Sequence, residues 1–203
     1  CGSSGEYNLM SDAERDSVLQ FVKDFAKPGE TLIAGTNAPH TAGVIANTLR
    51  AKAMGYDAVL LATPFYTKPT QAELIKHFKT VIAATDMNIV LYSYPDKDGV
   101  ELGWEVLDAL ADEPRIIGIK ESSGSLQRAI GIATRYAGRI QLVSGSDDIA
   151  LDFMLWGADS WICGPANCMA KAVCDLDRTF RSGDLAKAKA QMATLYTAMN
   201  ILE

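Results

Sequence analysis

The chain has 203 residues, of which 48% are apolar and 22% charged, a balance typical of a soluble globular domain with a sizeable core. The formal net charge of −6 offers no basic field to nucleic acid or anionic lipid, and no apolar stretch reaches the roughly twenty residues of a membrane span. The start has neither a basic leader nor an apolar signal core. We therefore expect a cytoplasmic protein with a small-molecule partner, and no nucleic-acid or membrane partner.

Short apolar, β-branched runs alternate along the chain with longer stretches of helical periodicity, which predicts parallel strands joined by helices. Helix starts carry capping-box spacing at Ser11 with Glu14 and at Thr70 with Glu73. The four cysteines contain no C-x-x-C pair and are expected to be free thiols. Strands are predicted at 31–36, 57–64, 88–95, 116–123, 140–147 and 160–167, with helices that include 72–86, 104–113, 169–183 and 183–203.

Parallel strands joined by helices form either an open doubly wound sheet or a closed barrel. Polar clusters follow nearly every predicted strand here, which favours an α/β fold of the (β/α)₈ TIM-barrel type over a sheet with one glycine-rich turn. Such barrels typically have about 250 residues, and CGSSGE looks like a loop after a strand, so two leading strands are expected to be absent. We predict a partial barrel over 1–182 and the start of a C-terminal helical extension over 183–203.

Lys120 ends the apolar run IIGIK, where a parallel strand is expected to be buried on both faces. Desolvation favours the neutral amine, which is the nucleophile that forms an imine with a keto carbonyl. The alternative is a lysine whose stem lies along the barrel and whose ammonium reaches solvent at the rim.

Hydroxyl groups follow other strands. Tyr92 in LYSYP is the candidate proton carrier for an imine mechanism, although a strand tyrosine is commonly a core or rim aromatic. Tyr66 in PFYTKP has the same two interpretations. Ser3 and Ser4 in GSSGE lie either in a simple tight turn or at a helix start that binds a carboxylate.

Phosphate and metal sites are not indicated. The strand that starts at Ile140 ends in Asp147 and Asp148, which would repel a phosphate, and helix capping explains these aspartates adequately. His40 and His77 lie in different segments without ligand spacing, and His77, in a helical pattern, is expected to be structural.

Taken in order, GSSGE, PFYTKPTQ, LYSYP, GIKESSG, VSGSDD and CGPAN resemble the signature of the dihydrodipicolinate synthase and N-acetylneuraminate lyase family along essentially the whole chain. The resemblance implies a barrel that binds pyruvate or another 2-keto acid as an imine, without an external cofactor. It also implies a lyase, with a keto acid as partner and an aldehyde as candidate second partner, assembled as a homotetramer of tight dimers.

The same resemblance assigns roles to individual residues. Lys120 matches the Schiff-base lysine, Tyr92 the tyrosine of a Y-N-x-P motif whose asparagine is Ser93 here, and Tyr66 an aromatic that reaches across a dimer contact. The hydroxyl pair that binds the keto acid carboxylate and helps relay protons matches Ser3 and Ser4. Backbone positions that line the pyruvate pocket match Gly145 and Ile162.

The chain departs from the family pattern around the second substrate. Where dihydrodipicolinate synthases have a carboxylate-binding arginine, this chain has Lys97, which replaces a bidentate fork by a point charge. Tyr7 and Tyr94 are bulkier than expected in that enzyme, and the serine in LYSYP resembles 4-hydroxy-2-oxoglutarate aldolases. A dihydrodipicolinate-synthase-like enzyme is therefore expected first, and an aldolase or dehydratase of 4-hydroxy-2-keto or 2-keto-3-deoxy acids second. A catalytically silent barrel that binds a keto acid or a protein is the alternative from another class.

Overall fold

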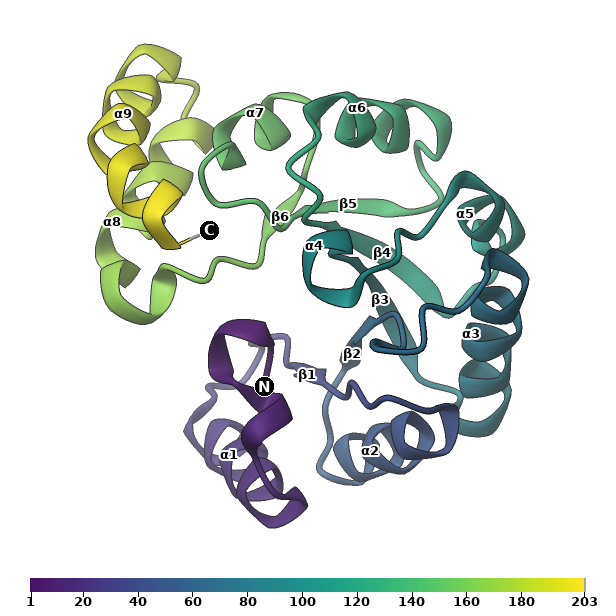
Figure 1. Ribbon diagram of the computed structural model, residues 1–203. Helices are drawn as coiled ribbons and strands as arrows, with labels where there is room; N and C mark the ends of the chain where they lie inside the picture. Colours follow the sequence, from purple (N-terminus) through teal and green to yellow (C-terminus); the bar gives the residue numbers. More distant parts are fainter. Residues whose placement is uncertain (203) are drawn as a thin grey trace. The chain divides into compact units, whose positions relative to one another are not determined.

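The computed structural model describes residues 1–202. The chain divides into two compact units, Cys1–Ile119 and Lys120–Glu203, and in both of them strands alternate with helices (Figure 1).

The first unit contains three complete parallel strands. Their order is β1-β2-β3, followed by the first residues of β4, and Ala62 at the end of β2 is paired with Tyr92 in β3. Strand β2 is buried along its whole length, as expected where both faces of a parallel sheet are covered. The elements are η1 Ser3–Gly5, η2 Tyr7–Leu9, α1 Asp12–Phe25, β1 Ile33–Gly35, α2 Thr41–Ala53, β2 Ala58–Ala62, α3 Gln71–Thr85, β3 Asn88–Ser93, α4 Pro95–Asp98, α5 Trp104–Leu110 and β4 Ile116–Glu121, the last crossing into the second unit.

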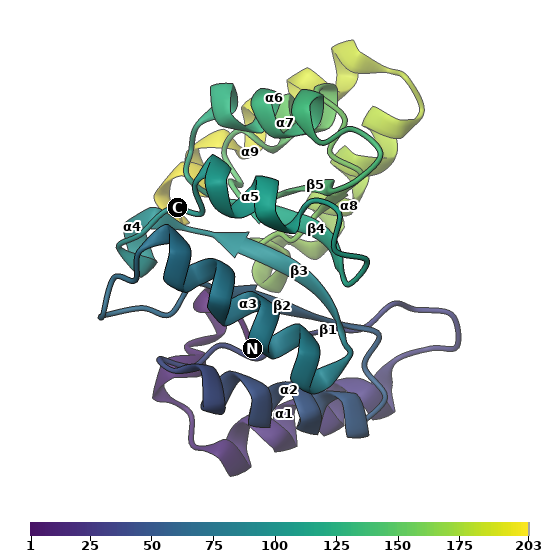
Figure 2. The ribbon, with the colours of Figure 1, turned by 90° about the vertical axis from the view of Figure 1, so that its right-hand side faces the viewer.

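Helices α2 and α3 lie side by side and α2 also packs on β2 (Figures 1 and 2). Both predicted capping boxes are present: the Ser11 amide donates to Glu14 Oε2 at 2.9 Å, and the Thr70 amide donates to Glu73 Oε2 at 2.8 Å. Each box satisfies backbone N–H groups that a helix start otherwise leaves unpaired, which stabilises it by about 1 kcal/mol.

His77 is buried on α3, where its Nδ1 lies 2.9 Å from the Thr41 hydroxyl of α2. Within residues 1–202 its Nε2 has no hydrogen-bond partner, and burial lowers the pKa of the imidazole to about 4. The prediction of a structural histidine agrees with this position.

The lowered pKa of His77 has a consequence for stability. Between about pH 6.5 and pH 4 the unfolded chain binds a proton that the folded chain does not, so folding becomes less favourable as the pH falls through this window. We expect the free energy of unfolding of the wild type to decrease by up to about 3 kcal/mol more than that of His77→Gln across it. Urea denaturation of both proteins at several pH values measures this, and equal slopes would refute the assignment.

The second unit begins with the end of β4 and contains a short parallel pair, in which Val143 of β5 is opposite Ser160 of β6. Helices α6 and α7 pack on β5, and α8 packs against α9 around Val173, Leu176 and Met192. The elements are α6 Leu126–Arg135, β5 Gln141–Ser144, α7 Ala150–Leu155, β6 Ser160–Trp161, α8 Ala166–Arg181 and α9 Leu185–Leu202.

The predicted fold class is confirmed: six parallel strands alternate with helices as in part of a (β/α)₈ barrel. Every predicted strand is present, but each is shorter than its apolar run, because the polar residues after the strand form loops. Helix α8 starts at Ala166, before the predicted position, and has a non-helical residue at Met169.

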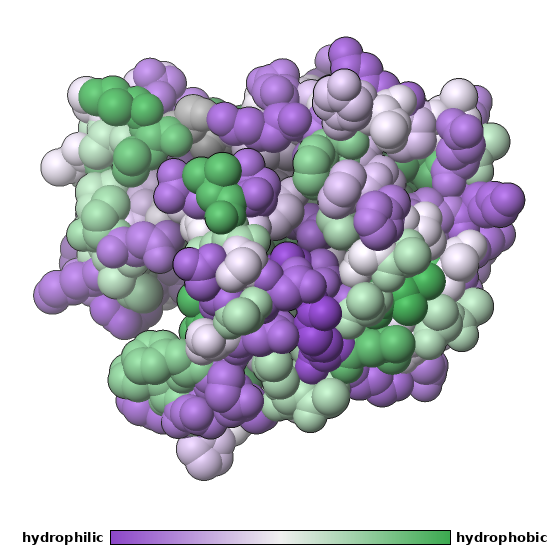
Figure 3. Space-filling model, turned by 60° about the horizontal axis from the view of Figure 1, so that its bottom comes forward, coloured by the Kyte–Doolittle hydropathy of each residue, from purple (hydrophilic) through white to green (hydrophobic). Residues whose placement is uncertain are grey.

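The surface of the described residues carries apolar side chains among polar ones, and Figure 3 shows one face. Phe21 and Phe25 stack on α1 with ring centroids 6.1 Å apart, both largely exposed. The four cysteines, all within the described residues, are free thiols, as predicted. Among residues 1–202, no helix has the length and apolar content to cross a membrane.

Candidate active site

Lys120 lies in the second half of β4, with only 9% of its surface exposed. The strand is buried on both sides of it, since Ile119 and Glu121 are fully covered. This burial gives little support to the alternative in which the ammonium extends into solvent, and it is the environment that an imine-forming lysine requires.

Gly145, directly after β5, provides the space that the Lys120 side chain occupies. Its N–H donates to the Glu121 carbonyl at 3.0 Å, so the two backbones lie close together. A Cβ at this position would overlap the Ser122 hydroxyl and would lie 2.7 Å from the Glu121 carbonyl oxygen and 2.9 Å from Lys120 Cε. The end of β4 therefore leaves no room for a side chain at Gly145, since the Ser122 hydroxyl, the Glu121 carbonyl and the Lys120 stem all lie against it.

We expect Gly145→Ala to displace the Lys120 stem and to slow the formation of a reducible keto-acid adduct at least tenfold, because small misplacements of a reacting group cost orders of magnitude in rate. Adduct formation is measured by mass spectrometry after reduction, and circular dichroism confirms that the variant is folded. A folded variant that forms the adduct at the wild-type rate would contradict this steric role.

A buried ion pair fixes the end of β4. Glu121 Oε2 accepts from Arg128 Nε at 2.7 Å, and Glu121 Oε1 accepts from the Ser123 amide at the same distance. Ser125 caps α6 by accepting from the Arg128 amide at 3.2 Å. The ion pair joins Glu121, the residue after the lysine, to the first turn of α6. The sequence analysis did not predict this pair, although an acidic residue directly after a buried strand could have indicated it.

Asp147 does not have the capping role predicted from the sequence. The residue before α7 is Ile149, which makes no side-chain cap, and the carboxylate of Asp147 instead accepts from Trp161 Nε1 at 2.8 Å. Burial raises the pKa of Asp147, and its contacts with Trp161 and Cys163 and the charge of Lys120 partly oppose this. The nearby Asp148 contacts Asn200 rather than the start of α7, with 3.5 Å between Oδ2 and Nδ2.

Tyr92 lies near the end of β3 in the first unit and is 3% exposed. Its ring centroid is 5.9 Å from that of Tyr94, with the planes tilted by 39°. The next residue, Ser93, is fully buried, and its hydroxyl accepts from the Leu102 amide at 3.4 Å. Ser93 thus helps to anchor the loop after α4, while the Tyr92 ring is held by packing.

A phenol and a carboxyl that the sequence analysis did not assign as site residues lie near Tyr92. Burial, together with the charges of Asp98 and Tyr92, raises the pKa of Tyr7 to about 12, and the charge of Arg15 opposes this rise. Burial also raises the pKa of Asp98 to about 6, which Thr63 partly opposes. Within residues 1–202, neither Asp98 Oδ2 nor Thr63 Oγ1 has a hydrogen-bond partner of normal geometry. The sequence could have indicated Asp98 as a site residue through its position, three residues after the Pro95 of LYSYP.

Ser3 and Ser4 form part of η1, where Ser3 is half-buried and Ser4 exposed. The backbone of Cys1 touches Gly35 so closely that a Cβ there would overlap the Cys1 carbonyl. The serine segment therefore begins beside the carboxyl end of β1, as an anion-binding role would require.

The remaining predicted site residues differ in their surroundings. Tyr66 has a positive φ of 73° and is 91% exposed, so its side chain is not part of a buried site within the first unit. Lys97 Nζ lies 5.8 Å from the centroid of the Tyr94 ring. Ile162 follows β6 and its N–H donates to the Ser144 carbonyl at 3.1 Å. Tyr92 lies in one unit and Lys120 in the other, and the approach of phenol to amine stays a prediction.

Alternating parallel strands and helices, with polar side chains at the carboxyl ends of the strands, define a (β/α)-barrel protein with its candidate site at those ends. The sequence profile described as "Dihydrodipicolinate synthetase family" matches residues 1–203. The chain belongs to this family.

Individual relatives agree with the profile. The chain is 39% identical over 189 residues to a 4-hydroxy-tetrahydrodipicolinate synthase of Trichlorobacter lovleyi, covering 93% of this chain and 65% of the relative. A dihydrodipicolinate synthase of Acinetobacter baumannii, solved in complex with pyruvate, superposes with a TM-score of 0.94 at 34% identity, over 99% of this chain and 69% of that one. A variant described as the first monomeric dihydrodipicolinate synthase superposes with a TM-score of 0.92 at 26% identity, over 99% and 68%. The chain thus spans about two thirds of the length of these relatives.

Proposed function

We propose that the protein is a lyase or synthase that binds pyruvate or another 2-keto acid as an imine on Lys120 and uses the imine for aldol condensation or cleavage. The observation that carries the proposal is the burial of Lys120 in β4 together with the space left for its stem by Gly145. Membership of the family supports it, as does the relative that was crystallised with pyruvate.

The chemistry needs only side chains of the protein and no external cofactor. The neutral Lys120 amine attacks the keto carbon to give a carbinolamine, and loss of water, assisted by a proton from Tyr92, gives the protonated imine. Loss of a proton from the carbon next to the imine gives an enamine, which adds to an aldehyde. In the reverse direction, carbon–carbon cleavage of the imine adduct releases the aldehyde and leaves the same enamine on Lys120, which takes up a proton and is hydrolysed to the keto acid and the free amine.

The keto acid is held at its carboxylate by Ser3 and Ser4. Gly145 and Ile162 line the pocket with their backbones, and donors of this kind bind an anion without requiring a full positive charge. The proposed substrates are small molecules, a keto acid and, as candidate second substrate, an aldehyde, and the proposed location of the reaction is the cytoplasm.

A second candidate is an aldolase or dehydratase of 4-hydroxy-2-oxoglutarate or 2-keto-3-deoxy sugar acids. It is favoured by Lys97, whose ammonium lies 5.8 Å from the centre of the Tyr94 ring and stands where the synthases have an arginine for the second substrate. The buried carboxyl of Asp98 lies near Tyr7, so the bulky tyrosines of this region are accompanied by a polar group.

The proposed assembly is a homotetramer of tight dimers, in which Tyr66 contributes to a site across the dimer contact. The exposure of Tyr66 and its positive φ support this, because an aromatic side chain held outward in a constrained backbone is suited to a partner surface. A monomeric relative exists, so the oligomeric state needs its own measurement by sedimentation.

Borohydride trapping tests the proposal. The full-length protein is incubated with pyruvate, reduced, digested and analysed by mass spectrometry, and we expect a reduced pyruvate adduct on the peptide that contains Lys120. An adduct restricted to other lysines, or none in folded protein, would favour the silent keto-acid-binding barrel. A panel of aldehydes and sugar acids with pyruvate then separates the two candidate activities.

A further inference from the structure

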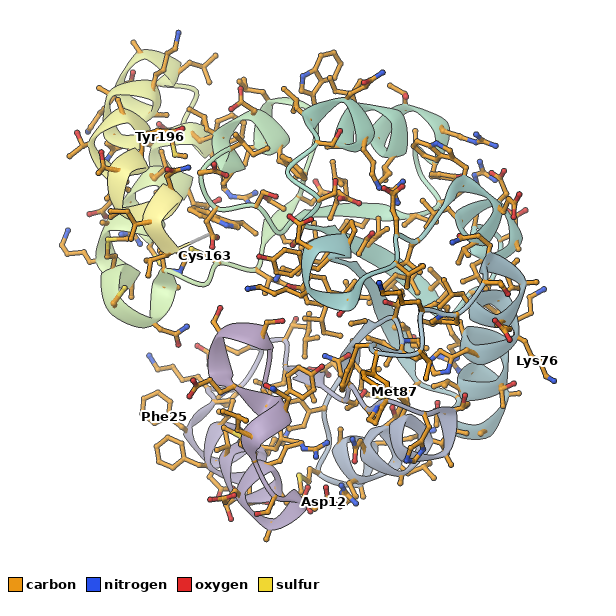
Figure 4. All side chains as sticks on the ribbon, in the orientation of Figure 1. Asp12, Phe25, Lys76, Met87, Cys163 and Tyr196 are labelled. Atoms are coloured by element: carbon orange, nitrogen blue, oxygen red, sulfur yellow. The ribbon has the colours of Figure 1, made fainter. Side chains whose placement is uncertain are left out.

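The carboxyl of Asp147 is a buried group in the second unit that the proposed chemistry does not use. It is 6% exposed, and its Oδ1 accepts a 2.8 Å hydrogen bond from the indole of Trp161 in β6. The thiol of Cys163, in the segment between β6 and α8 (Figure 4), and the Gly164 backbone also bind this carboxyl. A carboxyl held by three groups has a fixed position.

The Lys120 stem reaches the loop that carries Asp147, because Lys120 Cε lies 2.9 Å from the place that a Cβ of Gly145 would occupy, and Gly145 is two residues before Asp147. The positive charge of Lys120 lowers the pKa of Asp147, and by reciprocity a carboxylate at this position favours the protonated amine.

The ionisable residues next to Lys120 and Asp147 include Glu121, Asp148 and Cys163, and each of them has another contact or is uncharged. Glu121, next to the lysine, is paired with Arg128, which balances its charge. Asp148 contacts Asn200. Burial and the neighbouring Asp147 raise the pKa of Cys163, with a smaller effect from Cys168, so this thiol stays neutral at physiological pH.

We propose that Asp147 is a positioning residue that balances the positive charge on Lys120, both as ammonium and as protonated imine, and that Trp161 holds its carboxylate in place. The physical reason is that a buried cation is costly unless an opposite charge accompanies it. The assignment rests on the imine chemistry proposed above.

Asp147→Asn tests this, because it removes the charge while keeping an oxygen that can accept from Trp161. Without the carboxylate the Lys120 amine loses its proton more easily, so the pH midpoint of the rate of pyruvate trapping is expected to move about one unit lower. The equilibrium with pyruvate is expected to weaken about tenfold at the same time, because the protonated imine loses its counter-charge. Asp148→Asn is the matched control and is expected to leave both quantities unchanged.

Trp161→Phe keeps the charge but removes the indole donor, and its expected midpoint shift is smaller and in the same direction. This variant also provides the test if Asp147→Asn fails to fold. A purely structural role would lower the melting temperature, or slow trapping at every pH, without moving the midpoint. An unmoved midpoint in folded Asp147→Asn, or in folded Trp161→Phe if the former does not fold, would overturn the proposal.

Competitive acetylation of Lys120 with acetic anhydride as a function of pH measures the proton affinity of the amine without any keto acid. We expect the same direction of shift in this measurement for Asp147→Asn. If the wild type forms no pyruvate adduct but acetylation shows the shift, the imine function fails while the charge pairing stands. If trapping works but neither midpoint moves, only the charge pairing fails.

Discussion

Lys120→Ala is expected to abolish the reducible pyruvate adduct and with it all turnover, since no other group in the proposed mechanism can form the imine. The measurement is borohydride trapping followed by peptide mass spectrometry, with turnover assayed in parallel. Because Lys120 is buried in β4, truncation leaves a cavity, and some loss of stability is expected as well. Circular dichroism and the melting temperature separate the two effects.

Two further variants make the result on Lys120 specific. Lys120→Arg keeps a positive charge and a long stem but has no imine-forming amine, so it should retain more stability and still form no adduct. Lys76→Ala removes an exposed lysine that points away from α3 (Figure 4) and should react like the wild type. An adduct in folded Lys120→Ala at the wild-type level would remove the basis of the proposed function.

Alternation of apolar and helical segments was sufficient to predict the architecture from the sequence. A parallel strand buried on both faces needs an almost continuous apolar run, and each of the six runs contains one strand. The capping boxes at Ser11 and Thr70 were also predicted correctly, because their hydrogen bonds join residues only three positions apart in the sequence.

Features that depend on contacts between distant segments were missed. The carboxylate of Asp147 was interpreted as a helix cap because α7 follows it closely, whereas its partner, Trp161, lies fourteen residues further along the chain. Asp98 was not assigned a role from the sequence, because the burial that raises its pKa depends on how the segment after β3 folds. The role of Gly145 came from family resemblance, and its physical reason, the room for Lys120 Cε, required coordinates.

Tyr92→Phe is expected to lower kcat by about two to four orders of magnitude while the pyruvate adduct on Lys120 still forms, because a positioned proton carrier contributes about that much to a rate. The substitution removes only the hydroxyl and keeps the ring that packs beside Tyr94, so the melting temperature should change little compared with kcat. Steady-state kinetics across a pH range, together with single-turnover trapping, measure the two steps separately.

Tyr56→Phe is the matched control for the loss of a buried tyrosine hydroxyl in the same unit. The Tyr56 hydroxyl donates to the Leu19 carbonyl of α1 at 2.9 Å, and Tyr56 has no part in the proposed mechanism. Its removal is expected to cost about 1 kcal/mol of stability with kcat unchanged. The contrast assigns proton transfer to Tyr92 rather than to buried phenols in general, and full turnover by Tyr92→Phe would mean that another group moves the proton.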